Sequence, residues 1–328
     1  MTAARDCFCA VEEAETGALS VSLCGYTLKT LTALWLILRI QEMGSDMDKP
    51  LERVAVVGSG ILRTQIAMMA AHAGYAVTVY DPREEAFTAT YNKIKSDLTA
   101  KQEPFIPWEE WEKCKAAVQR VTSLDEAVGA AELVIEAAPE NIRLKNHLFK
   151  ELSRKSPPNA ILVTNSSSIP VSRMEDSSGR PERCLNIHFY FSLQGVKIVD
   201  IMGDSRTLPE VMQTGVNWIN SIGCIPLKVN EEILGFHFNR VWRAIKREVL
   251  YMWGNGFVDF RDSDRAWIVF TKMKEGPFAL MDKVGLDVIC DIEMVYYNDS
   301  KDLRDKPPDA LMEMIKRGEL GVKSGKGF

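Results

Sequence analysis

The stretch of sequence that decides the fold is residues 53–81, RVAVVGSGILRTQIAMMAAHAGYAVTVYD. Its two ends are short valine-rich runs, which predict strands, and its middle has the length and composition of a helix. A glycine pair, Gly58 and Gly60, follows the first run, and Asp81 follows the second. The expected elements are the strand Arg53–Val57, the helix Ile61–His72 and the strand Ala76–Tyr80. This order, ending on an acidic residue, is the pattern of a dinucleotide-binding unit.

Each residue of this pattern has a physical role in holding a dinucleotide. Gly58 permits the tight turn, and Gly60 lets the backbone approach a pyrophosphate at the helix N-terminus. The carboxylate of Asp81 would accept hydrogen bonds from the adenosine ribose and repel a 2′-phosphate. The pattern therefore predicts NAD rather than NADP as the cofactor.

One position of the glycine pattern departs from it. Arg63 stands where a third glycine normally lets the helix pack closely on the strand. The alternatives are a side chain that points to solvent, one that obstructs the site and one that binds the pyrophosphate. Between the last two, we expect obstruction, because close packing at this position tolerates little volume.

The rest of the chain continues the alternation of strands and helices and then changes to helices alone. The further strands expected are Leu133–Ala137, Ala160–Thr164, Cys184–Phe191, Val196–Asp200 and Ile225–Val229, with a helix at Ile142–Ser156 and two helices within Arg83–Gln119. The C-terminal helices expected are Gly235–Trp253, Asp262–Met273, Leu280–Tyr297 and Pro308–Arg317. The fold class is therefore α/β, a Rossmann-type doubly wound sheet followed by an all-helical C-terminal domain. The expected division is an N-terminal extension of uncertain structure (1–50), a nucleotide-binding domain (51–230) and a helical domain (231–328).

Four polar side chains lie at or near the ends of apolar runs, where an α/β sheet delivers groups to its ligand crevice. They are Ser167, His188, Asp200 and Asn239. A histidine base oriented by a carboxylate, with a hydroxyl and an amide beside it, suits proton transfer on an alcohol or carbonyl. Structural roles stay open for Ser167 and Asn239, since both precede or begin predicted helices.

We expect His72, His147 and His237 to be surface or packing residues, and Phe236, Phe238 and Trp242 to belong to the core.

The composition limits the classes of protein to which this chain can belong. The chain has 328 residues, 46% of them hydrophobic and 26% charged, which is typical of a soluble protein of two domains. Its net charge of −5 argues against a nucleic-acid-binding surface. Its seven cysteines show no CxxC pair or metal-ligand spacing, so we expect no metal site and a reduced, cytoplasmic location.

The N-terminal extension carries a weaker signal. Its acidic start suits neither a signal peptide nor a transit peptide. Residues 18–40 are apolar, but Lys29 interrupts them and Arg39 lies near their end. We favour a loosely packed helix or an unstructured extension, and a membrane-associated segment is the less favoured alternative.

Taken together, the motifs resemble the 3-hydroxyacyl-CoA dehydrogenase superfamily from about Arg53 to Phe328. The landmarks are Val57–Gly60, Tyr80-Asp81, Val134–Ala137, Pro139–Asn141, Thr164–Ile169, His188-Phe189, Gly235-Phe236, Asn239-Arg240, Gly276–Phe278, Val284–Asp287 and Gly325–Phe328. The resemblance implies that His188 is the catalytic base, Asp200 its orienting acid, and Ser167 and Asn239 substrate-side groups. It also implies that Glu140 and Lys145 contact the nicotinamide end of the cofactor and the substrate.

Three departures from the family surround this one site. Asp200 replaces a glutamate and is one methylene shorter, Phe191-Ser192 replaces Asn-Pro, and Arg63 replaces the third glycine. We expect an NAD-dependent oxidoreductase that interconverts a 3-hydroxy acid or its thioester with the 3-oxo form, acting as a homodimer through the C-terminal helices. The departures leave an alternative open, a non-redox member of the fold that is a structural or binding protein or performs acid/base chemistry without hydride transfer.

Overall fold

The structure, a computed structural model, describes residues 51–101, 105–190 and 197–328. The predictions for residues 1–50, including the possible membrane segment, lie outside the described residues. None of the helices in the described ranges is long and apolar enough to cross a membrane.

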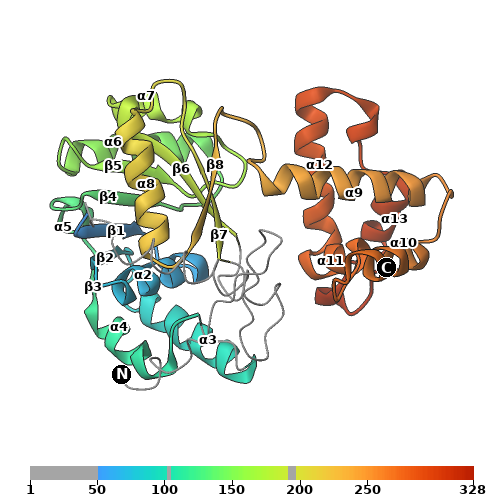
Figure 1. The fold of residues 1–328 in the computed structure, drawn as a ribbon, viewed down its shortest axis with the longest axis horizontal. Coiled ribbons are helices and arrows are strands. Elements are labelled where there is room, and N and C mark those ends of the chain that lie inside the picture. Colours follow the sequence, from blue (N-terminus) through green and yellow to red (C-terminus); the bar gives the residue numbers. More distant parts are fainter. Residues whose placement is uncertain (1–50, 102–104, 191–196) are drawn as a thin grey trace, which may run out of the picture.

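The first part of the chain forms an eight-stranded sheet in the order β3-β2-β1-β4-β5-β6-β7-β8 (Figure 1). The strands are β1 (Arg53–Val57), β2 (Ala76–Tyr80), β3 (Val118–Val121), β4 (Leu133–Glu136), β5 (Ile161–Thr164), β6 (Cys184–Phe189), β7 (Ile198–Met202) and β8 (Ile225–Val229). Every neighbouring pair is parallel except β6 and β7, which run antiparallel. The strand order runs outward from β1 to β3 and then continues on the other side of β1 with β4. Ligands are therefore expected at the carboxyl ends of β1 and β4, where the order switches.

Helices cover both faces of the sheet, as in a doubly wound fold. One face packs against α2 (Ile61–His72), α3 (Ala86–Lys101), α4 (Trp111–Ala117) and α8 (Pro209–Ser221). The other packs against α5 (Leu124–Val128) and α6 (Ile142–Lys155), and the short α7 (Glu175–Ser178) lies against α6. Figure 1 shows α8 and α2 in front of the sheet, with α6 and α7 behind its upper part. The expected fold class is confirmed.

In the sheet region one strand was not predicted, and the end of another was predicted wrongly. The two helices expected within Arg83–Gln119 are confirmed, but the strand β3 that follows Ala117 was not predicted. Val118 and Val121 are buried there, where the chain pairs with β2. The strand expected to end at Asp200 instead continues to Met202, so Asp200 lies in the middle of β7. The ends of the strands expected at Phe191 and Val196 lie outside the described residues.

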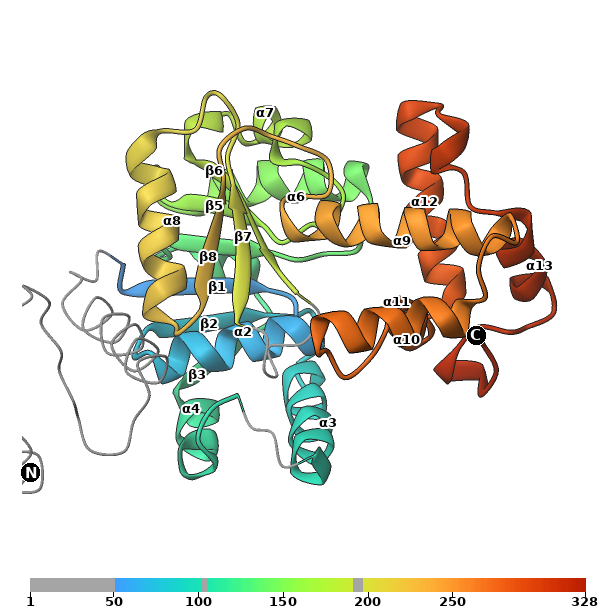
Figure 2. The same ribbon diagram turned by 45° about the vertical axis from the view of Figure 1, so that its right-hand side comes forward.

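The C-terminal part consists of helices and lies apart from the sheet, which α9 connects to it (Figures 1 and 2). The helices are α9 (Phe238–Gly254), α10 (Phe260–Thr271), α11 (Pro277–Val284), α12 (Leu286–Ser300) and α13 (Asp309–Lys316). They share an apolar core of their own, which includes Leu250, Phe278, Met281 and Leu311. Buried ion pairs join α9 to α12, with Lys246 Nζ 2.9 Å from Glu293 Oε1. The boundary near residue 230 stays a prediction.

The prediction of a single helix at Leu280–Tyr297 was also wrong, because the structure has two helices there. Gly285 has φ of 103° and separates α11 from α12. A side chain there would be strained in this backbone region and would lie 3.0 Å from Lys323 Nζ. The chain turns at the glycine, and α12 leaves in a new direction while remaining in contact with α11.

Candidate active site

The pairing of β6 with β7 brings a histidine and a carboxylate together. His188 and Asp200 are directly opposite each other in this antiparallel pair. Side chains alternate between the two faces of a strand, so Leu185, Ile187 and Phe189 enter the core under α8. His188 projects from the opposite face of β6, and Tyr190, the first residue after the strand, packs its ring against it. The pairing of the two strands therefore holds His188 and Asp200 side by side.

His188 is buried against groups from three other elements. Its Nε2 lies 3.2 Å from the Ser167 Oγ, and its ring stacks on Phe236 with centroids 5.0 Å apart. The Nδ1 lies 4.0 Å from Asp200 Oδ2, and no described group forms a hydrogen bond with it. Burial lowers the pKa of His188 to about 4, although the nearby Glu140 charge opposes this shift. The imidazole is therefore neutral at physiological pH.

Asp200 is fully buried, and its hydrogen-bond partner is a residue that the sequence analysis did not single out. The Tyr190 hydroxyl donates to Asp200 Oδ2 at 2.5 Å. Burial raises the pKa of Asp200, while the Tyr190 hydrogen bond and the His237 and Phe238 backbone N–H groups favour its charged form. Tyr190 follows His188 by two positions and so shares its strand face, which is the pattern that could have identified it.

The structure brings Ser167 and Glu140 to the same corner as His188. Glu140 Oε1 accepts hydrogen bonds from the Ser168 backbone N–H at 3.0 Å and its hydroxyl at 2.7 Å, and also from the Ser166 hydroxyl. Burial would raise the pKa of Glu140, but these serines and the Lys145 charge lower it below its usual value. Ser167 caps no helix, because the following 3-10 turn has Pro170 in the capping position. The corner therefore combines a charged carboxylate, an exposed hydroxyl and a neutral imidazole.

Asn239 lies in the first turn of α9, close to this corner. Its neighbour Phe238 packs edge-on against Tyr190 with ring centroids 5.5 Å apart. The prediction that Phe238 belongs to the core was wrong, because its exposed fraction is 42%. Phe236 is buried, as predicted. No described contact joins the Asn239 side chain to His188. Phe191 and Ser192, where the chain departs from the family, lie outside the described residues.

Lys145 is placed differently from its expected role. Its ammonium group is buried and lies 3.0 Å from Glu136 Oε1 and 3.1 Å from the Ala138 carbonyl oxygen. It also lies 3.5 Å from Glu140 Oε2, whereas Ser166 and Ser168 bind the other oxygen of that carboxylate, Oε1. The resemblance implied direct contact with cofactor and substrate, but the charge of Lys145 is already shared by two carboxylates. A buried ammonium needs such partners, and Glu136, which the sequence analysis did not single out, supplies the closer one.

The glycine turn between β1 and α2 has the conformation that a dinucleotide requires. Gly58 has φ of 103°, and α2 begins directly after Gly60, whose carbonyl accepts the Thr64 N–H at 2.9 Å. Asp81 follows β2 and accepts a 2.6 Å hydrogen bond from the Ser59 hydroxyl. Burial would raise the pKa of Asp81, but the bonds from Ser59 and Arg83 lower it below its usual value. A charged acceptor therefore stands at the ribose position.

The Arg63 side chain folds over this glycine turn. A β-carbon at Gly58 would lie 2.9 Å from Arg63 Cδ, and one at Gly60 would lie 3.2 Å from Arg63 Nη1. The guanidinium donates to the Ala137 carbonyl oxygen beyond β4. Burial lowers the pKa of Arg63, opposed by the charges of Glu136 and Asp81. The Arg63 side chain thus does not point to solvent, and it occupies the space above the glycines.

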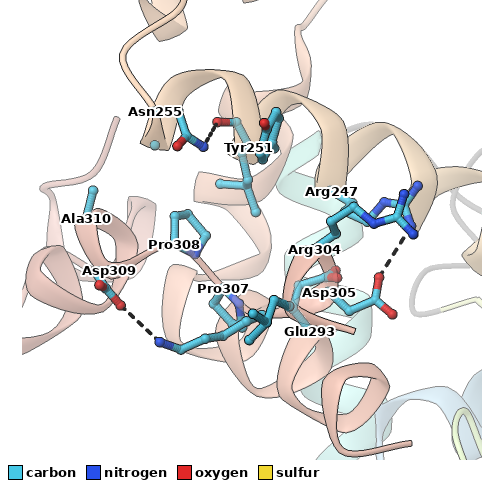
Figure 3. Close-up of a pocket in the computed structure, with 14 residues that line it drawn as sticks. Arg247, Tyr251, Asn255, Glu293, Arg304, Asp305, Pro307, Pro308, Asp309 and Ala310 are labelled. Carbon is cyan, nitrogen blue, oxygen red and sulfur yellow. Dashed lines mark hydrogen bonds and ion pairs between the residues drawn. The ribbon is translucent and has the colours of Figure 1, made fainter. Parts of the chain in front are cut away.

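Two other features of the surface contain none of the predicted site residues. A hollow of about 420 Å³ lies among α9, α12 and α13 (Figure 3), but its charges are paired, as in Arg247 with Asp305 at 3.3 Å. His72, Glu110 and Cys114 have potential metal-ligand atoms within 4.8 Å of one another, a grouping that the sequence spacing did not suggest. A 2.9 Å contact from His72 Nδ1 to Glu110 Oε2 already accounts for that grouping.

The fold and this site match known proteins along most of the chain. Residues 53–233 match the family model of the 3-hydroxyacyl-CoA dehydrogenase NAD-binding domain, and residues 235–328 match that of its C-terminal domain. The chain belongs to the 3-hydroxyacyl-CoA dehydrogenase family. The resemblance drawn from the motifs is confirmed, and NAD is the cofactor of this dehydrogenase-like enzyme.

Several relatives of this 3-hydroxyacyl-CoA dehydrogenase family member show the extent of the likeness. A probable 3-hydroxybutyryl-CoA dehydrogenase of Bacillus subtilis is 31% identical over 281 residues, 85% of this chain and 96% of the relative. The crystal structure of (S)-3-hydroxybutyryl-CoA dehydrogenase from Ralstonia eutropha is 25% identical, with a TM-score of 0.77 over 84% of this chain and 98% of that one. A diketoreductase that acts on dicarbonyl compounds is 28% identical, with a TM-score of 0.76 over 86% of this chain and 99% of that one.

The residues present fit NAD at all but one point. The left-handed Gly58, the uncapped N-terminus of α2 and the charged Asp81 form the backbone and ribose contacts that the cofactor needs. The exception is the Arg63 guanidinium, which lies where a pyrophosphate would approach the glycines. Because that side chain is long and flexible, NAD would fit this turn only with Arg63 in another rotamer.

Proposed function

We propose that this protein interconverts a 3-hydroxyacyl thioester and its 3-oxo form, with His188 as the general base. The observation that supports this most is the neutral, buried imidazole whose Nε2 contacts an exposed hydroxyl, that of Ser167. NAD, when bound, supplies the hydride acceptor, and its reduced form the hydride. The substrate class rests on relatives whose names specify 3-hydroxybutyryl-CoA.

The roles of the other groups follow from their chemistry. Nε2 of His188 takes the proton of the substrate hydroxyl as the carbon is oxidised, and returns it in the reverse direction. The Ser167 hydroxyl and the Asn239 amide hold the substrate oxygen. Asp200 stabilises the imidazolium electrostatically across 4.0 Å. Glu140 lies on the Ser167 side of the site and adds a negative charge that also favours the imidazolium.

The cofactor contacts are proposed on the same basis. Gly58 and Gly60 admit the pyrophosphate to the N-terminus of α2, and Asp81 accepts hydrogen bonds from the adenosine ribose. Lys145 acts indirectly by fixing Glu136 and Glu140, and Arg63 must leave the glycine turn before the pyrophosphate binds.

We further propose that the protein is a homodimer whose interface involves α10 and α12. Large apolar side chains are exposed on both helices, including Val269 at 62% and Phe270 at 89%. On α12, Val288, Ile292 and Val295 have the spacing of one helix face. Exposed apolar surface of this kind marks protein–protein contacts.

The test of the catalytic proposal separates binding from turnover. NADH binding is followed by its fluorescence, and turnover by NADH absorbance with 3-oxobutyryl-CoA. We expect the wild type to bind NADH and reduce this thioester. His188→Ala should keep NADH affinity and lose on the order of 10²–10⁴-fold in rate, because proton transfer and dinucleotide binding use different parts of the cleft.

The matched control is His147→Ala, an exposed histidine on α6, which should leave both quantities unchanged. Near wild-type turnover in His188→Ala would refute the assigned base. Wild-type protein that fails to bind NADH would instead favour the non-redox alternative.

A further inference from the structure

Tyr190 contacts both the candidate base and the acid expected to orient it, through its ring and its hydroxyl respectively. It donates to Asp200 Oδ2, the same carboxylate oxygen that lies nearest to His188 Nδ1. The Tyr190 ring also packs edge-on against the imidazole, with centroids 4.8 Å apart and planes at 71°. Tyr190 therefore contacts both members of the pair while His188 and Asp200 remain 4.0 Å apart.

Tyr190 and Asp200 are held at the start of α9 as well. Backbone N–H groups of Phe238 and Asn239 act on the Tyr190 hydroxyl, and those of His237 and Phe238 act on the Asp200 carboxylate. Burial and the neighbouring Asp200 charge raise the pKa of Tyr190, so the phenol keeps its proton and remains the donor. The hydroxyl and the carboxylate thus form one hydrogen-bonded group with the N-terminus of this helix, where negative charge is stabilised.

His188 is left without a hydrogen bond at Nδ1 within the described residues. In a base–acid pair that works together, this nitrogen donates to the carboxylate and the contact stabilises the imidazolium. We propose that Tyr190 is a positioning residue, whose hydroxyl holds Asp200 on α9 and so keeps the basicity of His188 low. The catalytic consequence rests on the proposed function, but the effect on the imidazole does not.

The other charged and titratable groups around His188 do not substitute for this contact. Glu140, from the loop after β4, is held by Ser166, Ser168 and Lys145. His237, which precedes α9, is exposed and acts on Asp200. Phe236 and Ser167 complete the surroundings with an apolar ring and an uncharged hydroxyl. Among the side chains described around the pair, Tyr190 is the one hydrogen-bonded to Asp200.

Removal of one oxygen atom tests the proposal. In Tyr190→Phe the carboxylate loses its donor and is free to accept from His188 Nδ1, so we expect the imidazole to titrate at higher pH. The protein has four histidines, and NMR titration of their ring signals, with His188→Gln for assignment, follows this group directly. We expect a rise of about one pH unit, a tenfold gain in proton affinity.

Two further variants make the result specific. Asp200→Asn should not raise the His188 titration, and Tyr190→Phe should produce no rise in an Asp200→Asn background, because the carboxylate is then absent. Tyr251→Phe removes a hydroxyl from a half-exposed tyrosine of α9 and should change nothing. No rise in Tyr190→Phe, or an equal rise without the carboxylate, would overturn the proposal.

The titration needs neither substrate nor turnover, so its outcome is independent of whether the protein transfers hydride. Where turnover is also present, the acid limb of the kcat/KM profile should move to higher pH in Tyr190→Phe by the same amount. A purely structural role of Tyr190 would lower stability without moving either titration.

Discussion

At the scale of single residues, we expect Arg63 to hinder cofactor binding. Its guanidinium lies over Gly58 and Gly60 and bonds to the Ala137 carbonyl oxygen, so this contact must break before a pyrophosphate can enter. We expect Arg63→Gly to tighten NADH binding several-fold, measured by fluorescence titration. Arg154→Ala, which removes an exposed arginine of α6, is the control and should have no effect. A several-fold loss of affinity in Arg63→Gly would identify Arg63 as a phosphate ligand instead.

We expect Asp81 to determine which dinucleotide is preferred. Its charged carboxylate, held by Ser59, is placed to accept hydrogen bonds from the ribose and to repel a 2′-phosphate. We expect Asp81→Ala to weaken NADH binding roughly ten- to a hundredfold, the worth of a hydrogen bond to a charged group, and to reduce the preference over NADPH. Titrations with both nucleotides measure this, with Asp97→Ala on α3 as an exposed control. Unchanged affinities for both would mean that the nucleotide site lies elsewhere.

The sequence predicted the neighbours of His188 better than their contacts. Ser167, His188 and Asp200 could be grouped because the sequence predicted a strand end at or near each of them, and the structure brings the three side chains together although Asp200 lies in the middle of its strand. The hydrogen bond of Asp200 to Tyr190, and that of Lys145 to Glu136, depend on side-chain distances that spacing alone does not give. The third-glycine position showed that Arg63 was unusual, but the direction of its side chain required the structure.

At the scale of elements, strands with valine-rich runs were predicted almost to the residue, and irregular segments were not. β3 has only four residues, two of them polar and exposed, and so lacks the apolar run that identified its neighbours. Pairing with β2 compensates for this weak local preference. At Gly285 the apolar pattern continues through the break, and only the left-handed backbone divides α11 from α12.

The attachment of α6 to the sheet depends on a buried ion pair. Lys145 and Glu136 are both essentially inaccessible, with side-chain exposures of 1% and 0%. Lys145→Met would leave the Glu136 charge unpaired, and we expect it to lower the free energy of unfolding by about 3–5 kcal/mol. Urea denaturation measures the change, and Lys150→Met, at an exposed position of the same helix, should change it little. Equal stability of the two variants would show that the pair contributes nothing net.

At the scale of the whole molecule, the helical part presents apolar side chains that its own core does not bury. If two copies pair through α10 and α12, a charge placed on this surface should separate them. We expect Phe270→Asp to convert the dimer to a monomer, measured by light scattering after gel filtration. Leu303→Asp is the matched control, because Leu303 is 75% exposed but belongs to neither helix. A wild-type monomer, or a Phe270→Asp dimer, would contradict the proposed interface.

The antiparallel ladder between β6 and β7 has a consequence for how this site can evolve. Main-chain hydrogen bonds fix the two α-carbons of His188 and Asp200 opposite each other, independently of either side chain. Aspartate and glutamate differ only in the third base of their codons, so a single-nucleotide substitution changes the reach of this acid by one methylene. The spacing between acid and base can therefore be adjusted in one mutational step, on a backbone that need not move.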